Sequence, residues 1–221
     1  MPRRLNLPDS ASVAEPRPDG QLFAPSAERN AAAICDLVAD HAPDRGRALE
    51  IASGTGQHVV ALSRRLPDLT WQPSDVDPVR RRSIDAWVGK AEAANVAPAI
   101  ELDATAPGWG STQGDTALVL LVNLLHLVST GEAKTLISEV AQALSPGGVF
   151  VLYGPFLRDG EASSDGDAKF HDSLRRQDTE IGYKDNWDVI EWLQSQGLEL
   201  VEVVEMPANN LAFVSRSATG G

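Results

Sequence analysis

The octet at residues 49–56, Leu-Glu-Ile-Ala-Ser-Gly-Thr-Gly, constrains the fold of this chain more than any other stretch. Its first four residues are apolar except Glu50, which is typical of a buried parallel strand. The turn at 53–56 contains two glycines, and apolar residues recur at helical spacing over 57–66. A strand, a glycine turn and a helix in this order predict an open α/β sheet that presents a ligand site at the carboxyl ends of its strands.

Two ligand classes fit such a turn, and a generic turn without a ligand is the third reading. A dinucleotide site has the spacing Gly-x-Gly-x-x-Gly, whose last glycine lets helix and strand pack closely. Here Gly54 and Gly56 are followed by Val59 at that position, which disfavours a nicotinamide cofactor. The octet resembles instead the Glu-x-Gly-x-Gly-type first motif of S-adenosylmethionine-dependent methyltransferases. In that motif the acid at the position of Glu50 supports the loop and the methionine amino group.

A second predicted strand, residues 69–75, ends in a carboxylate. Asp75 lies 21 residues after Gly54, about where an acid binds the ribose hydroxyls in a Rossmann-like site. A carboxylate suits a vicinal diol because it accepts two hydrogen bonds. Asp77 stands before a proline and is assigned as the N-cap of the next helix. Either acid could be only a cap, but we assign the ribose to Asp75.

Two further predicted strands also end in polar residues. A third strand at 99–102 ends at Asp103 and Ala104, and the methyltransferase pattern implies that this acid faces the adenine amino group. The unbroken apolar run at 117–122 predicts a central fourth strand. It is followed by Asn123 and His126, and methyltransferases carry Asn-x-x-His at this point, beside the reactive methyl.

The remaining periodicity completes an α/β chain. We expect a helix at 131–144 that stops at the breaker 145–148, a fifth strand at 149–153, and two closing strands joined as a hairpin. The methyltransferase order 3-2-1-4-5-7-6, with the last strand antiparallel and helices on both faces, fits this pattern. The other predicted elements are short helices at 167–176 and 186–196 and strands at 198–205 and 210–216.

Longer motifs carry a closer resemblance. Ser-Ala-Glu-Arg-Asn at 26–30, Ile-Ala-Ser-Gly-Thr-Gly-Gln-His at 51–58, Trp-Gln-Pro-Ser-Asp-Val-Asp-Pro at 71–78, Tyr-Gly-Pro-Phe at 153–156 and Met-Pro-Ala-Asn-Asn at 206–210 are similar to the methyltransferase-like protein 26 family. The match covers nearly everything from 23 to 216. It implies the fold and an S-adenosylmethionine cofactor, and it implies no substrate.

Composition fits a single enzyme domain. We expect a flexible arm at 1–20, one domain at 21–216 and a flexible tail at 217–221. The net charge of −12 disfavours nucleic acid and anionic membranes as partners. No apolar run reaches membrane-spanning length, the first residues lack a secretory signal, and a single buried thiol, Cys35, fits a reducing cytoplasm. The four histidines lack metal-ligand spacing. A monomer or a homodimer fits the sequence equally well.

The leading helix carries a further candidate site. Ser26 is expected to cap it, with Glu28 in the first turn. In related folds such a helix closes over the cofactor, and Arg29 would then bind the methionine carboxylate as a forked donor, with Asn30 beside it. The alternative for both residues is a solvated helix face.

A long polar segment, residues 157–185, follows the fifth strand. Because it hangs over the carboxyl edge of the sheet, we expect a substrate lid in which Phe170 faces inward. Phe156 is a second expected substrate contact, and Tyr153 is a candidate catalytic residue. His126 is the candidate general base, since an unperturbed pKa near 6.5 suits base work at neutral pH. The alternative is that His126 packs under the loop and orients Asn123.

The sequence therefore predicts an S-adenosylmethionine-dependent methyltransferase that acts on an unidentified small-molecule acceptor by in-line transfer. The first alternative is a catalytically silent protein of the same fold that binds the cofactor or a protein partner, and the second is a nicotinamide oxidoreductase. The expected cofactor contacts are Glu50, Ala52, Ser53, Gly54, Thr55, Gly56, Asp75, Val76, Asp103, Ala104, Asn123, Arg29 and Asn30.

Overall fold

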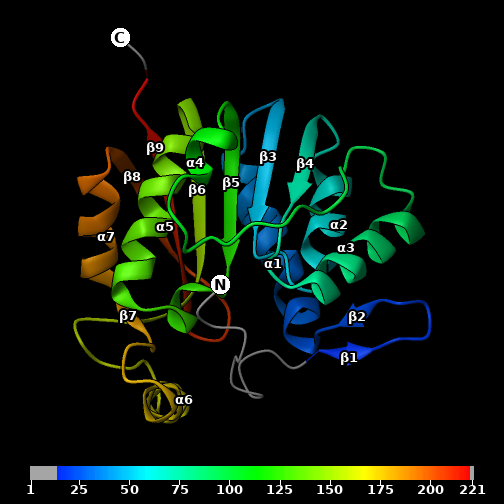
Figure 1. Cartoon of the computed structure of the whole chain (residues 1–221). Helices are drawn as coiled ribbons and strands as arrows, with labels where there is room; N and C mark the ends of the chain where they lie inside the picture. The colour runs from blue at the N-terminus through cyan, green and yellow to red at the C-terminus, as the bar shows by residue number, and fades with distance from the viewer. Residues whose placement is uncertain (1–13, 220–221) are drawn as a thin grey trace.

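The computed structural model describes residues 14–219, which form a mixed sheet with helices on both faces (Figure 1). Strands β3 to β6 are parallel, and β9 is antiparallel to both β6 and β8. The order across the sheet is β4 (Leu69–Pro73), β3 (Gly46–Ile51), β5 (Thr116–Val122), β6 (Leu144–Leu157), β9 (Asn210–Ser217) and β8 (Leu198–Glu205), with β7 (Lys184–Asp185) paired to β6. The α/β class and the antiparallel last strand are confirmed.

The predicted third strand at 99–102 is wrong. The chain runs beside β4 but meets it only in isolated bridges, Trp71 with Val96 and Ser74 with Ile100. Between them Pro98 has no N–H to donate. The neighbouring Ala99 N–H is diverted to the side chain of Asp85 at 2.9 Å. The ladder is therefore interrupted, although the segment still occupies the outer position that the predicted order gives it.

The helices divide between the two faces of the sheet (Figure 1). One face is covered by α1 (Pro25–His41), α2 (Gln57–Arg65) and α3 (Pro78–Ala91), and the other by α4 (Trp109–Thr112), α5 (Thr130–Ala143) and α7 (Asn186–Ser195). The short helix η1 (Leu125–Leu127) follows β5, and α6 (Asp165–Gln177) lies beyond the carboxyl ends of the parallel strands. The breaker at 145–148 is not a loop but a bulge at the start of β6, where the register shifts from Leu144 to Val149.

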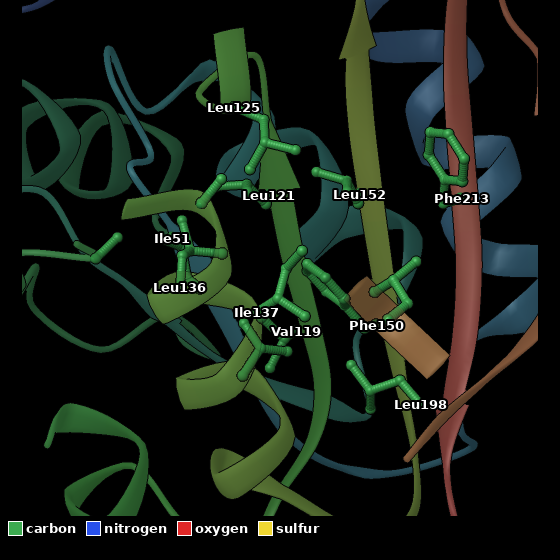
Figure 2. Packing of buried hydrophobic residues seen from close by; sticks show 14 of the residues in the cluster. Ile51, Val119, Leu121, Leu125, Leu136, Ile137, Phe150, Leu152, Leu198 and Phe213 are labelled. Atoms are coloured by element: carbon green, nitrogen blue, oxygen red, sulfur yellow. The ribbon is translucent and has the colours of Figure 1, made fainter. Parts of the chain in front are cut away.

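Successive side chains of the central strand β5 point to opposite faces of the sheet, and each face has its own hydrophobic core. Val119 and Leu121 of β5 pack with Leu136 and Ile137 of α5 (Figure 2), whereas Leu118 belongs to the cluster under α1 and α2. Both faces of the sheet are therefore closed by apolar packing. A ligand can bind only at an edge of the layers, and in such a fold that edge is the carboxyl end of the strands.

Part of the expected flexible arm at 1–20 is structured. Residues 1–13 lie outside the described part of the chain, but β1 (Glu15–Pro16) pairs with β2 (Leu22–Phe23). The guanidinium of Arg17 lies 4.0 Å from the centroid of the Phe23 ring, and Asp19 pairs with Lys90 of α3 at 2.6 Å. This hairpin was missed because cation–π and ion-pair contacts leave no apolar periodicity in the sequence.

The ends of the domain also differ from expectation. Of the expected tail at 217–221, Ser217 still belongs to β9 and its hydroxyl donates to Ser145 O at 2.5 Å, while residues 220–221 lie outside the described part. Ser26 is not the cap of α1, because the helix begins at Pro25 and Ala24 takes the cap position. The Ala24 N–H donates instead to Oε1 of Gln57 at 2.7 Å, which ties the start of α1 to the glycine turn.

Gly56 is required by its packing. It precedes α2 with φ of 96°, and a Cβ there would lie 2.7 Å from Cα of Ile84 in α3. We expect Gly56→Ala to lower the free energy of unfolding by about 2–4 kcal/mol, combining overpacking with a left-handed alanine. Gly89→Ala is the matched control, because nothing lies within 4 Å of that helical site. It should stabilise by about 0.5–1 kcal/mol. Equal urea midpoints for the two variants would contradict this packing.

Candidate functional site

A cavity of about 1320 Å³ opens at the carboxyl ends of the parallel strands. Its walls come from the turns that follow β3, β4 and β5, from the first half of α1, and from the segment that contains α6 and β7. Pockets for one drug-sized ligand measure about 300–1,000 Å³. The cavity is therefore large enough for two small molecules side by side.

The glycine turn is held by backbone hydrogen bonds to the end of β4. The Ser53 N–H donates to Ser74 O at 2.8 Å, and the Ser74 N–H donates to Glu50 O at 3.0 Å. Gly54 has φ of 60° and lines the cavity, as do Ser53, Thr55 and Ala52, whose φ of 52° is unusual for alanine. Backbone held in this sparsely populated region clusters at ligand sites. Gly56 does not line the cavity, because its role is the contact with α3 described above.

Asp75 joins the two turns through its carboxylate. Oδ2 accepts from the Gly54 N–H at 3.0 Å and Oδ1 accepts from the Asp77 N–H at 2.9 Å. Burial raises its pKa, and these backbone donors partly offset the effect. Each carboxylate oxygen can accept a second hydrogen bond, so the group can still bind a ligand. The prediction that Asp77 caps the next helix is confirmed, because its Oδ1 accepts a hydrogen bond from the Val79 N–H of α3 at 2.7 Å.

Among the described residues that line the cavity, two side chains have a buried polar atom without a hydrogen-bond partner: Oε2 of Glu50 and Nδ1 of His126. The side chain of Glu50 is 1% exposed. Burial raises the pKa of this carboxyl to about 8, and the nearby charge of Asp75 adds to the shift. A buried polar atom without a partner is rare in folded proteins. A cationic group of a ligand would supply the missing partner.

The other expected cofactor contacts lie along the same wall. Val76, Asp103, Ala104 and Asn123 all line the cavity. Oδ1 of Asp103 accepts from both the N–H and the hydroxyl of Thr105, at 3.0 and 2.7 Å. Asn123 has φ of 57°, which turns the chain sharply out of β5 toward η1. Topology therefore brings the ends of three chain segments to one wall, as the sequence predicted.

The first half of α1 forms another part of the cavity wall. Arg29 is exposed at the rim, so its side chain is available to a ligand. Asn30 is buried, and its Oδ1 lies 2.8 Å from Nε2 of His58. Burial lowers the pKa of His58 to about 4, so the ring is neutral at physiological pH. Asn30 is thus fixed by the protein itself, unlike Arg29.

His126 is not the neutral-pH base that its unperturbed pKa suggested. It lines the cavity but is buried under the segment at 157–185, with ring centroids 5.9 Å from Phe170 and 6.0 Å from Tyr183. Burial lowers its pKa to about 3, and the positive charge of Lys184 contributes. A histidine with so low a pKa is a weak base. The packing alternative therefore agrees better with the structure.

Tyr153 and Phe156 of β6 face opposite sides of the sheet. Tyr153 lines the cavity, and burial raises the pKa of its phenol while hydrogen bonds with Asn30 and Asn210 oppose that shift. Phe156 is not a cavity residue: it packs edge-on against Phe213 in the core, with centroids 4.8 Å apart. Positions three apart on a strand lie on opposite faces. Pro155, on the same face as Tyr153, lines the cavity in its place.

Some cavity residues were not predicted. Asp167, Phe170 and Tyr183 of the segment at 157–185 line the cavity, but only Phe170 was expected to contact a ligand. Asn210 was not assigned to the site, and His58 was weighed only as a weaker candidate base than His126, although both lie in the motifs that carry the family resemblance. That shared membership was the one signal in the sequence that could have found them.

Three further findings concern metal binding, membrane spans and the cysteine. Within residues 14–219, no three His, Cys, Asp or Glu side chains gather as a metal site, and no helix is both long and apolar enough to cross a membrane. Cys35 is a buried free thiol, as expected, and burial raises its pKa to about 11.

Comparison with known proteins places the chain in a family. The family model described as "Protein of unknown function (DUF938)" matches residues 21–217. The chain belongs to the DUF938 family. That description assigns no activity, so the functional argument rests on the site.

Solved structures show the fold. An O-methyltransferase family protein from Burkholderia thailandensis superposes with a TM-score of 0.74 at 17% identity, over 86% of this chain and 57% of that one. PigF with SAH gives 0.69 at 15% identity, over 85% and 55%. The [4+2]-cyclase SpnF gives 0.66 at 15% identity, over 85% and 81%. This DUF938 chain thus has a class I methyltransferase fold but spans little more than half the length of the first two proteins.

The raised pKa of Glu50 predicts a pH-dependent stability. Because folded Glu50 keeps a proton that the unfolded state releases near pH 4.5, the contribution of this carboxyl to stability falls as pH rises from about 4.5 to about 8. Glu50→Gln removes this loss. We expect the melting temperature of the variant, relative to wild type, to increase steadily from pH 5 to pH 8. Each kcal/mol of free energy of unfolding corresponds to a shift of roughly 2–4 °C in melting temperature for a chain of this size. Parallel melting curves across that range would show that Glu50 titrates normally.

Proposed function

We propose that this chain is an S-adenosylmethionine-dependent methyltransferase that acts on a small-molecule acceptor. The observation that carries the proposal is the unpartnered, buried carboxylate oxygen of Glu50 beside the glycine turn. The α-ammonium group of the cofactor is a cation that would donate a hydrogen bond to this oxygen. The size of the cavity, which exceeds that of a one-ligand pocket, supports an acceptor beside the cofactor.

The residues of the wall fit the remaining parts of that cofactor. We assign the ribose hydroxyls to Asp75, whose two oxygens are oriented by backbone N–H donors and retain acceptor capacity. We assign the adenine amino group to Asp103 and the methionine carboxylate to Arg29, whose guanidinium can donate two parallel bonds. Gly54 fits close approach of the ligand, because it lines the cavity without a Cβ and adopts a φ of 60°.

The cofactor supplies an electrophilic methyl group, and the protein must place a nucleophile in line with it. Placement alone can lower the barrier by about 7–11 kcal/mol. Because burial leaves His126 a weak base, we propose that the acceptor reacts through a lone pair that needs no proton removal by this histidine. The role of His126 is then to pack under Phe170 and Tyr183 at the acceptor end of the cavity.

We also retain the segment at 157–185 as the proposed substrate lid. Phe170 and Tyr183 give it an aromatic inner surface, and Leu174 anchors α6 by complete burial. The closer kinship with methyltransferase-like protein 26, the cytoplasmic location and the choice between monomer and homodimer stay predictions.

Two alternatives differ in what they bind. A nicotinamide cofactor is disfavoured because Val59 of α2, at the position of the third glycine, is completely buried in the core. A catalytically silent protein of the same fold agrees with the geometry but would leave the acceptor half of the cavity unused. The similarity to the cyclase SpnF makes the distinction necessary, since it is evidence that one fold serves different reactions.

Calorimetric titration tests the cofactor assignment. We expect wild-type protein to bind S-adenosylhomocysteine, and Asp75→Ala to bind it about tenfold or more weakly, because hydrogen bonds to a charged group contribute about 1.5–3 kcal/mol each. Asp77→Ala is the matched control. It should lower stability by about 1 kcal/mol through loss of the helix cap, with a smaller effect on affinity.

The outcomes separate the alternatives. Failure of wild-type protein to bind S-adenosylhomocysteine would end the methyltransferase proposal, and binding of NAD in its place would favour the oxidoreductase. Equal affinities for wild type and Asp75→Ala would remove Asp75 from the ribose site while leaving the proposed class intact.

A further inference from the structure

Three aromatic rings meet at the end of the cavity that the segment at 157–185 covers. The ring centroids of His126 and Phe170 lie 5.9 Å apart, and that of Tyr183 lies 6.0 Å from the first and 6.1 Å from the second. All three side chains line the cavity, and each pair meets edge to face. Because aromatic rings attract one another in this geometry, a further aromatic ring fits among these three residues, which we call the ring cluster.

Two histidines contact Tyr183, and the protein satisfies only one of them. The ring centroid of His171 in α6 lies 5.7 Å from that of Tyr183, and its Nδ1 accepts a hydrogen bond from the Tyr183 N–H at 3.0 Å. His126 makes a similar ring contact, but its Nδ1 is buried with no hydrogen-bond partner in the described part of the chain. Of the two, His126 lines the cavity and His171 does not. The unsatisfied nitrogen therefore belongs to the ring that borders the cavity.

The imidazole of His126 can form a hydrogen bond with a neutral ligand. Its side chain is 5% exposed, and burial lowers its pKa to about 3, so the ring is uncharged at physiological pH. A neutral imidazole has one N–H donor and one acceptor nitrogen. Rotation about χ2 is roughly two-fold, so the ring can turn a nitrogen toward the cavity with little change in shape. A hydroxyl group both donates and accepts, and it would therefore satisfy either nitrogen.

The charges around the ring cluster disfavour an anionic ligand. Two carboxylates line this end of the cavity: Asp167, whose Oδ1 accepts from the hydroxyl of the tyrosine in the cluster at 3.3 Å, and Glu132 in the first turn of α5. The cationic side chains in the described lining, Arg29 and Arg80, come from α1 and α3. The ammonium group of Lys184 lies outside the lining and donates to two backbone carbonyl oxygens, at 2.7 and 2.9 Å. An anion beside the cluster would thus meet charges of its own sign.

We propose that the ring cluster binds an uncharged aromatic acceptor, and that His126 selects it through a hydrogen bond to a hydroxyl or N–H group on its ring. His126 is then a specificity-determining residue that orients the acceptor and removes no proton from it. A site built to bind such a group rejects the analogue that lacks it, because the polar atom of the site is then left without a partner. That the bound molecule is the methyl acceptor rests on the proposed function, whereas its binding at the ring cluster does not.

Three small probes separate the parts of this proposal: phenol, toluene and benzoate. NMR titrations of the ligand-free protein, followed at the backbone amides of residues 125–128 and 170, give their dissociation constants. We expect phenol to bind wild type about tenfold more tightly than toluene, because toluene leaves the His126 nitrogen unsatisfied. Phenol should also shift the ¹⁵N signals of the His126 ring, as a new hydrogen bond would. Benzoate should bind more weakly than phenol, because of the two carboxylates.

Matched variants test the polar and the apolar parts of the cluster in turn. His126→Phe keeps a ring but removes both nitrogens, so phenol and toluene should bind it with nearly equal affinity. Phe170→Ala should weaken both probes alike and keep their ratio. His171→Asn is the control, because asparagine retains an acceptor for the Tyr183 N–H and lies outside the lining, so the wild-type ratio should persist. If His126→Phe fails to fold, the wild-type ratio and the ¹⁵N shift carry the test.

Three results would overturn the proposal. They are equal affinities of phenol and toluene for wild type, an unchanged ratio in His126→Phe, and tighter binding of benzoate than of phenol. A parallel titration with S-adenosylhomocysteine keeps the proposed function separate. Failure of wild type to bind that molecule would sink only the methyltransferase, and the ring cluster would still be an aromatic binding site. Equal binding of phenol and toluene by protein that does bind it would sink only the aromatic acceptor.

Discussion

The carboxylate of Asp75 is the contact on which the site depends. By accepting from the N–H groups of Gly54 and Asp77, it connects the turn after β3 to the turn before α3. Two backbone donors lower the energetic cost of burying this charge. Once these turns are fixed, Glu50 is held at the end of β3 with an unpartnered oxygen, and the cavity acquires its polar wall.

Most of the fold could be predicted because its periodicity is local. The central strand at 117–122 is apolar throughout, since both of its faces are covered, and the helices show their stripes in sequence. The third strand could not be placed in this way. Its apolar residues were read correctly, but the loss of the ladder comes from Pro98 and from a hydrogen bond to Asp85, which lies in a different element. The β1–β2 hairpin was missed for a similar reason, because its contacts with α3 are not local.

The site was predictable where it depends on topology and not where it depends on burial. Carboxyl ends of parallel strands meet at one edge, so Asp75, Asp103 and Asn123 could be placed together from the sequence. The pKa of His126 depends on how deeply the segment at 157–185 covers it, and no local pattern encodes that depth. Phe156 was a different error, since its position three residues after Tyr153 already placed it on the opposite face.

Proteins that share a fold can differ in activity, because they differ in which polar groups the fold leaves without a hydrogen-bond partner. At 15–17% identity the solved structures share this fold, yet the fold serves an O-methyltransferase family protein and a cyclase alike. In this chain Asn30 and His58 satisfy one another at 2.8 Å, so they shape the wall without demanding a ligand. Glu50 does not, because its oxygen is buried with no protein donor. A fold tolerates such a cost where a ligand offsets it, and the unpartnered oxygen is therefore the observation that supports the proposed cofactor site.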